Sequence, residues 1–158
     1  MINRFNSNKK EIDLTNFLEK VNSILLSFSF VYLITMTAIE SPIVQYILLR
    51  RDLKKMKNYN DGAIIAQACH ASTAAIYKSI DDEITKLYLN DLDRMHKVTL
   101  GVDGGADQLN EISQLLKENS IQHYLWIEQP ENIPTALALK PYYKKDVEQF
   151  FSNLKLYR

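Results

Sequence analysis

The sequence predicts an α/β fold, a three-layer sandwich in which a four-stranded mixed sheet carries helices on both faces. First, segments with strand propensity alternate with segments of helical apolar spacing in the order βααβαββα. Second, the first strand-like segment is almost continuously apolar, which is typical of a central strand buried on both faces. Third, the link between the last two strands is short, which favours an antiparallel pair and hence a mixed sheet.

The first strand is expected over the apolar run 43–49, and a basic loop follows it over residues 50–61. A loop that leaves a strand and enters a helix favours anions, because free amides and the helix dipole attract negative charge. The loop is therefore either a phosphate-binding surface or a solvated turn. Its basic residues are Arg50, Arg51, Lys54, Lys55 and Lys57.

The helix that follows is the most informative segment of the chain. Asp61 is its expected N-cap, and the helix is expected to begin near Gly62. Ala63, Gln67 and His70 stand at i, i+4 and i+7, so they share one face of this helix. Gln67 is therefore expected to be presented rather than hidden.

The remaining elements follow from periodicity and from the breaks between them. A second helix is expected over 81–94, with Ile84, Leu87, Tyr88 and Leu92 on its inward side. A strand over 96–102, a helix over 107–119, strands over 121–127 and 135–139, and a closing helix over 144–154 complete the order.

Composition fits one globular domain with a core, since 46% of the 158 residues are hydrophobic. Nineteen basic and nineteen acidic residues cancel, so overall charge neither favours nor excludes a nucleic-acid partner. The single cysteine, Cys69, fits a reducing compartment, and its alanine-rich surroundings predict a packed thiol. The three histidines lack metal-ligand spacing, so no metal site is expected.

Residues 1–40 are expected to form an N-terminal extension, and residues 41–158 the domain. The extension contains an uncharged segment over 21–39, which is close to the length that crosses a bilayer as a helix. This segment has three possible roles: a dispensable extension, a membrane anchor, or a targeting segment or extra packed helix. The expected location is cytoplasmic, with mitochondrial and membrane-anchored locations as the alternatives.

The pairs Ala66-Gln67 and His70-Ala71 match the signature helix of the type 2 peptidyl-tRNA hydrolases. The resemblance extends through almost all of residues 43–158, including the segment from Thr135 to Pro141. The family carries a lysine four residues before the glutamine, and Ala63 stands there in this chain. The sequence most resembles a divergent subfamily, the peptidyl-tRNA hydrolase domain-containing protein 1 group.

This resemblance implies hydrolysis of the ester between a peptide and the terminal ribose of tRNA, without a metal or organic cofactor. It implies Gln67 and Thr135 as catalytic residues. For the family's aspartate it offers Glu128, with Glu131 as the alternative. The implied partner is peptidyl-tRNA, or the tRNA acceptor end, held by the basic loop.

His70 is placed with the substrate-binding residues, although a histidine packed under its helix is the competing interpretation. Trp126, with Tyr124, either stacks a terminal base or fills a core. Because an alanine supplies neither a cation nor a proton, Ala63 keeps a second function open. In that case the domain is a catalytically silent module that binds tRNA or a protein. The sequence leaves the oligomeric state open.

Overall fold

The computed structural model describes residues 19, 21, 22, 24, 25 and 41–158 of the chain. The expected extension over 1–40 and its apolar segment 21–39 therefore lie largely outside the described residues. None of the helices within the described part of the chain combines the length and the apolar character needed to cross a bilayer.

The domain is built on one mixed sheet with the strand order β3-β4-β1-β2-β6, and β5 lies beside β1. The strands are β1 (Ile43–Arg50), β2 (His96–Val102), β3 (His123–Glu128), β4 (Ile133–Leu139), β5 (Tyr142–Tyr143) and β6 (Lys155–Leu156). β1 pairs in parallel with β2, and every other pairing of these strands is antiparallel.

The predicted α/β class and mixed sheet are confirmed, but the predicted count of four strands is wrong, since the sheet contains six. The two missed strands, β5 and β6, are two residues long. A two-residue strand is too short to show the period-2 alternation by which strands are recognised.

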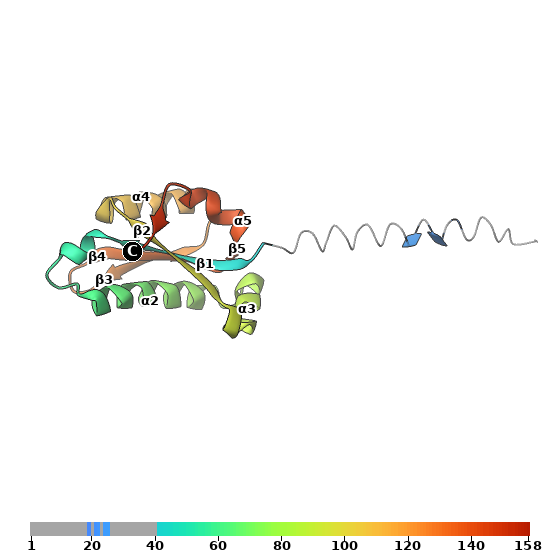
Figure 1. The fold of residues 1–158 in the computed structure, drawn as a ribbon, viewed down its shortest axis with the longest axis horizontal. Helices are drawn as coiled ribbons and strands as arrows, with labels where there is room; N and C mark the ends of the chain where they lie inside the picture. The colour runs from blue at the N-terminus through green and yellow to red at the C-terminus, as the bar shows by residue number, and fades with distance from the viewer. Residues whose placement is uncertain (1–18, 20, 23, 26–40) are drawn as a thin grey trace, which may run out of the picture. The chain divides into compact units, whose positions relative to one another are not determined.

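Four α-helices and three 3₁₀ turns connect the strands. The helices are α2 (Asp61–Lys78), α3 (Glu83–Asn90), α4 (Gly105–Glu118) and α5 (Lys144–Val147). The 3₁₀ turns are η1 (Asp52–Lys55), η2 (Leu92–Arg94) and η3 (Glu148–Phe151). α2 lies on one side of the sheet, and α4 and α5 lie on the other (Figure 1).

The alternation of side chains along β1 divides the core into two clusters. Val44 and Leu48 belong to the cluster that includes Leu109 and Leu116 of α4. Ile47 and Leu49 belong to the cluster that includes residues of α2. β1 is therefore buried on both faces, as its continuous apolar run predicts.

Three details of the helices differ from the sequence predictions. Asn60, not Asp61, is the N-cap of α2, and its Oδ1 accepts a hydrogen bond of 2.9 Å from the Ala63 amide. The predicted helix 81–94 ends at Asn90 and is followed by the 3₁₀ turn η2. Leu87, within α3, and Leu92, in η2, are 53% and 64% exposed, so the prediction that they point inward is wrong. The predicted helix 144–154 becomes the 3₁₀ turn η3 from Glu148.

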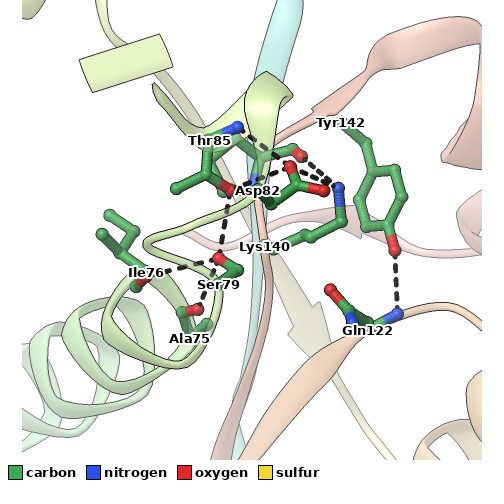
Figure 2. Close-up of polar contacts among 9 residues, drawn as sticks. Ala75, Ile76, Ser79, Asp82, Thr85, Gln122, Lys140 and Tyr142 are labelled. Atoms are coloured by element: carbon green, nitrogen blue, oxygen red, sulfur yellow. Dashed lines mark hydrogen bonds and ion pairs between the residues drawn. The ribbon is translucent and has the colours of Figure 1, made fainter. Parts of the chain in front are cut away.

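A polar network fastens the end of α2 and the start of α3 to the sheet (Figure 2). Lys140 Nζ lies 2.9 Å from Asp82 Oδ1, and the Lys140 side chain is only 7% exposed. Thr85 Oγ1 donates to Ser79 Oγ at 3.1 Å, and Ser79 Oγ donates to the Ala75 carbonyl at 2.9 Å. Burial raises the pKa of Asp82, but hydrogen bonds from Lys140 and Thr85 outweigh it and hold this pKa below its usual value.

Candidate functional site

The candidate site lies where the end of β1, the first half of α2 and the start of β4 meet. Gln67, from α2, and Thr135, from β4, are in direct contact there. Arg50 ends β1, and its Nη1 donates a hydrogen bond of 2.7 Å to the Pro134 carbonyl, next to Thr135. The sheet thus brings together residues that are 84 positions apart in the sequence.

Thr135 Oγ1 donates a hydrogen bond of 2.7 Å to Gln67 Oε1. Gln67 is 3% exposed and Thr135 is fully buried, so the expectation that Gln67 is presented rather than hidden is wrong. Position 67 lies between Ile64 and Ala71 on the side of α2 that packs on the sheet. Because the amide oxygen is occupied by Thr135, the Gln67 amide nitrogen is the group left to donate to another molecule.

Arg50, predicted to bind substrate, is 6% exposed and committed to neighbours within the protein. Besides Pro134, it donates to both carboxylate oxygens of Asp52, at 3.0 Å and 2.6 Å. These hydrogen bonds from Arg50 hold the pKa of Asp52 below its usual range. The structure therefore places Arg50 as a brace between β1 and the start of β4.

Arg51 and Lys54 hold the C-terminal residues. Arg51 Nη2 donates to the carbonyls of Lys155 and Leu156, at 3.2 Å and 2.8 Å, and Lys54 Nζ donates to the Arg158 carbonyl at 3.3 Å. Both cations also lie over the Tyr157 ring. These two basic residues therefore fasten β6 and the residues after it to the turn η1.

Lys55 and Lys57 are exposed, and within the described part of the chain neither forms an ion pair. Their ammonium groups are free to meet an anion. Of the five basic residues predicted to bind substrate, these two are thus the ones that keep their charge uncommitted.

Trp126 connects His70 to Glu128. The His70 ring stacks on the Trp126 ring, with centroids 4.5 Å apart and an angle of 17° between the planes. The indole Nε1 donates a hydrogen bond of 2.7 Å to Glu128 Oε2. His70 is exposed, so the interpretation that it packs under its helix is wrong.

Tyr59 is a site residue that sequence reasoning missed. Its side chain is 7% exposed, and its hydroxyl has no hydrogen-bond partner among the described residues. Burial raises the pKa of Tyr59, and the charges of Glu131 and Glu128 raise it further. Tyr59 therefore lies near both candidate acids, in the loop just before the α2 N-cap, and no motif in the sequence marks it.

Ala63 lies in the first turn of α2, one turn before Gln67, and brings no charge to the site. Cys69 is exposed, so the prediction of a packed thiol is wrong. In the described residues, no three His, Cys, Asp or Glu side chains are grouped in a way that could hold a metal ion.

The chain is similar to known proteins over the whole of this domain. The model of the family "Peptidyl-tRNA hydrolase PTH2" matches residues 43–157. The mouse protein named "Putative peptidyl-tRNA hydrolase PTRHD1" is 44% identical over 119 residues, which cover 73% of this chain and 83% of the mouse protein. Its human counterpart is 43% identical over 117 residues, with the same coverage.

An archaeal relative, the "Peptidyl-tRNA hydrolase" of Methanothermobacter thermautotrophicus, is 33% identical over 117 residues, covering 71% of this chain and 97% of the relative. These matches support a hydrolase and confirm the predicted resemblance to this family and to its domain-containing protein 1 group. The chain belongs to the peptidyl-tRNA hydrolase PTH2 family.

Proposed function

We propose that this protein hydrolyses the ester between a peptide and the terminal ribose of tRNA, and that residues 41–158 carry the activity. Family membership supports the reaction class. The observation that carries the site is the 2.7 Å hydrogen bond from Thr135 to Gln67. It holds the Gln67 side chain in one orientation and leaves its amide nitrogen as a donor.

In this proposal Gln67 stabilises the negative charge that develops on the ester carbonyl oxygen. Water attacks the carbonyl carbon, the bond to the ribose oxygen breaks, and a proton from water ends on that oxygen. The Gln67 Nε2 donates to the oxyanion, and a donor held in place before the reaction needs no reorganisation when the charge appears. Thr135 is the positioning residue for this amide.

Glu128 is the proposed carboxylate that orients the attacking water. One of its oxygens, Oε2, is held by Trp126 Nε1, which leaves Oε1 to accept a hydrogen bond from water. Glu131 is the alternative acid, because its charge, like that of Glu128, raises the pKa of Tyr59. Glu131 is exposed, whereas Glu128 is half-buried, which favours Glu128. Exchanging each acid for its amide separates the two.

We propose that the tRNA acceptor end is held through phosphates by Lys55 and Lys57, with Arg51 and Lys54 at the same loop. Arg50 supports this surface from inside through Asp52. His70 is proposed to contact substrate together with Trp126, on which it stacks. We further propose that the protein acts in translation, through its peptidyl-tRNA substrate, and that it is cytoplasmic.

The test is single-turnover hydrolysis of a peptidyl-tRNA by the purified 158-residue chain, with contaminating hydrolase excluded by mass spectrometry. We expect turnover by the parent and its loss in Gln67→Ala, about 100-fold, the usual effect of removing one oxyanion donor. Gln114→Ala is the matched control, because Gln114 is an exposed glutamine of α4. An active Gln67→Ala variant would show that the proposed site is wrong.

A second function is favoured by Ala63 and by the burial of Gln67. The site lacks the family lysine, and its glutamine is only 3% exposed. Both features also fit a catalytically inactive domain that binds tRNA or a protein. This alternative would be supported if the parent did not hydrolyse peptidyl-tRNA and the Ala63→Lys variant did. Salt-dependent tRNA binding without turnover would then identify an RNA-binding module.

A further inference from the structure

An apolar groove of about 630 Å³ lies between α2 and the segment η2–β2, and neither Gln67 nor Thr135 is among the residues that line it. Ile47 and Leu49 of β1 and Thr99 of β2 lie at its base, and Ala68 of α2 and Leu92 of η2 lie on its walls. The groove exists because α2 packs over β4, β3 and β1, and the neighbouring strand β2 lies beyond this cover.

The rim of this groove exposes large apolar side chains to solvent. Ile65 is 63% exposed, Leu92 64% and Met95 37%. A concave and mostly apolar surface of this volume with a few polar groups is typical of a site for a small molecule.

Lys97 brings a positive charge to the groove. Its ammonium donates hydrogen bonds to Gln45 Oε1 and, at 3.1 Å, to Ser72 Oγ, and both acceptors are neutral. Among the described residues, no carboxylate lies within 4.0 Å of this ammonium. Desolvation lowers the pKa of Lys97, as expected for a cation that lacks an anionic partner.

We propose that this groove binds a linear acyl carboxylate, with the carboxylate on Lys97 and the hydrocarbon chain along the apolar walls. The charge of the carboxylate complements the ammonium, which uses two of its three N–H donors on Gln45 and Ser72 and lies 5.5 Å from the centroid of the Tyr88 ring. The chain covers the exposed side chains of Ile65, Leu92 and Met95. The ligand of this groove differs in class from the tRNA ester proposed for the Gln67 site. Binding in the groove does not depend on ester hydrolysis.

The chain carries its own reporter for this site, because its single cysteine lies in the groove wall. Cys69 is exposed and lies near Lys97, where a thiolate would raise the pKa of the ammonium. A bound acyl chain should therefore slow alkylation of the thiol. The probe is dodecanoate, and dodecanol is the matched ligand without the charge.

In the full-length protein we expect dodecanoate to protect Cys69 at about tenfold lower concentration than dodecanol, the usual gain from a charge-assisted hydrogen bond. Lys97→Met should abolish this preference, and Lys97→Arg should keep most of it. Lys117→Met is the control, because Lys117 belongs to α4 on the other side of the sheet. Equal protection by both ligands, or protection by neither, would overturn the proposal.

A second variant avoids the effect of Lys97 on the fold, since Lys97 also holds Gln45 and Ser72. Leu92→Asp changes an exposed rim residue and adds a negative charge beside the chain. We expect at least tenfold weaker protection by dodecanoate, with an unchanged unfolding midpoint. Undiminished protection in this variant would place the ligand elsewhere and contradict the proposal. Because the readout is thiol alkylation, its result is separate from that of the hydrolysis assay.

Discussion

Thr135 and Gln67 form a buried hydrogen bond of 2.7 Å that joins the start of β4 to the middle of α2. A hydroxyl of a strand thereby sets the orientation of a glutamine amide on a helix 68 residues away. In the proposed site, the amide nitrogen of Gln67 is therefore the one polar group of this side chain left to donate to a substrate.

Thr135→Val should therefore lower kcat while leaving KM nearly unchanged. Valine keeps the shape but cannot donate to Gln67, so the amide is free to rotate, and we expect a loss of about tenfold, below the effect of deleting an oxyanion donor. Steady-state hydrolysis of peptidyl-tRNA measures this. Thr135→Ser keeps the hydroxyl and should retain activity. Equal losses in the two variants would show that packing, not the hydrogen bond, is responsible.

Lys55→Met should weaken tRNA binding mainly at low salt. Each phosphate contact that is lost lowers the slope of log affinity against log salt by about 1. Fluorescence anisotropy with a labelled tRNA at several salt concentrations gives the slope. Lys117→Met, an equal loss of charge on α4, is the control. An unchanged slope in Lys55→Met would remove Lys55 from the tRNA surface.

Asp82→Asn should destabilise the protein at neutral pH by about 2 kcal/mol, because it leaves the Lys140 ammonium buried without a carboxylate. The folded pKa of Asp82 lies below its usual value of 3.8, so its contribution is full above pH 3.8 and is lost as the pH falls through the folded pKa. The difference in unfolding free energy between parent and variant should shrink in that window.

Urea denaturation between pH 2.5 and pH 7 measures this difference. Asp91→Asn is a suitable control, since Asp91 pairs with Arg94, whose side chain is 84% exposed, and such pairs contribute at most about 1 kcal/mol. A difference for Asp82→Asn that stays constant down to pH 2.5 would contradict the role of the carboxylate charge.

His70→Ala should expose the indole of Trp126 to water, because the stacked ring covers one of its faces. Trp126 is the chain's one tryptophan, so intrinsic fluorescence reports on it alone. We expect a shift of the emission maximum to longer wavelength and stronger quenching by acrylamide. His96→Ala changes an exposed histidine of β2 and should leave the emission as it is. An identical spectrum for His70→Ala would contradict the stacking.

The sequence predicts the large elements of this fold well, because they bury long periodic apolar runs. β1 follows from its continuous apolar run, and α4 from Leu109, Leu116 and their spacing. β5 and β6 escape prediction because two-residue strands depend on pairing partners far away in the sequence. The sequence does not distinguish Asn60 from Asp61 as the N-cap of α2, because Asn and Asp cap helices about equally well; the structure places Asn60 there.

The candidate site is predicted in its residues but not in its contacts. The family resemblance picks out Gln67 and Thr135, yet helical spacing alone does not tell which face of α2 meets the sheet, and Gln67 is buried. Arg50 donates to the Pro134 carbonyl and to Asp52. The contact with Pro134 depends on the register of β4, which the sequence of the loop does not predict. The burial of the Tyr59 hydroxyl likewise depends on how the strands pack, so it cannot be predicted from the sequence of the loop.

The central position of β1 has a consequence for how the protein is made. β1 is the first strand of the domain to leave the ribosome, but Leu48 pairs with Leu137 and Val44 with Tyr142. At about 5 to 20 residues per second, these two partners in β4 and β5 emerge roughly 4 to 20 seconds later. Throughout that interval one edge of this apolar strand is unpaired, because only β2 has emerged to pair with the other edge, so the nascent chain is a natural client for chaperones that shield hydrophobic segments during translation.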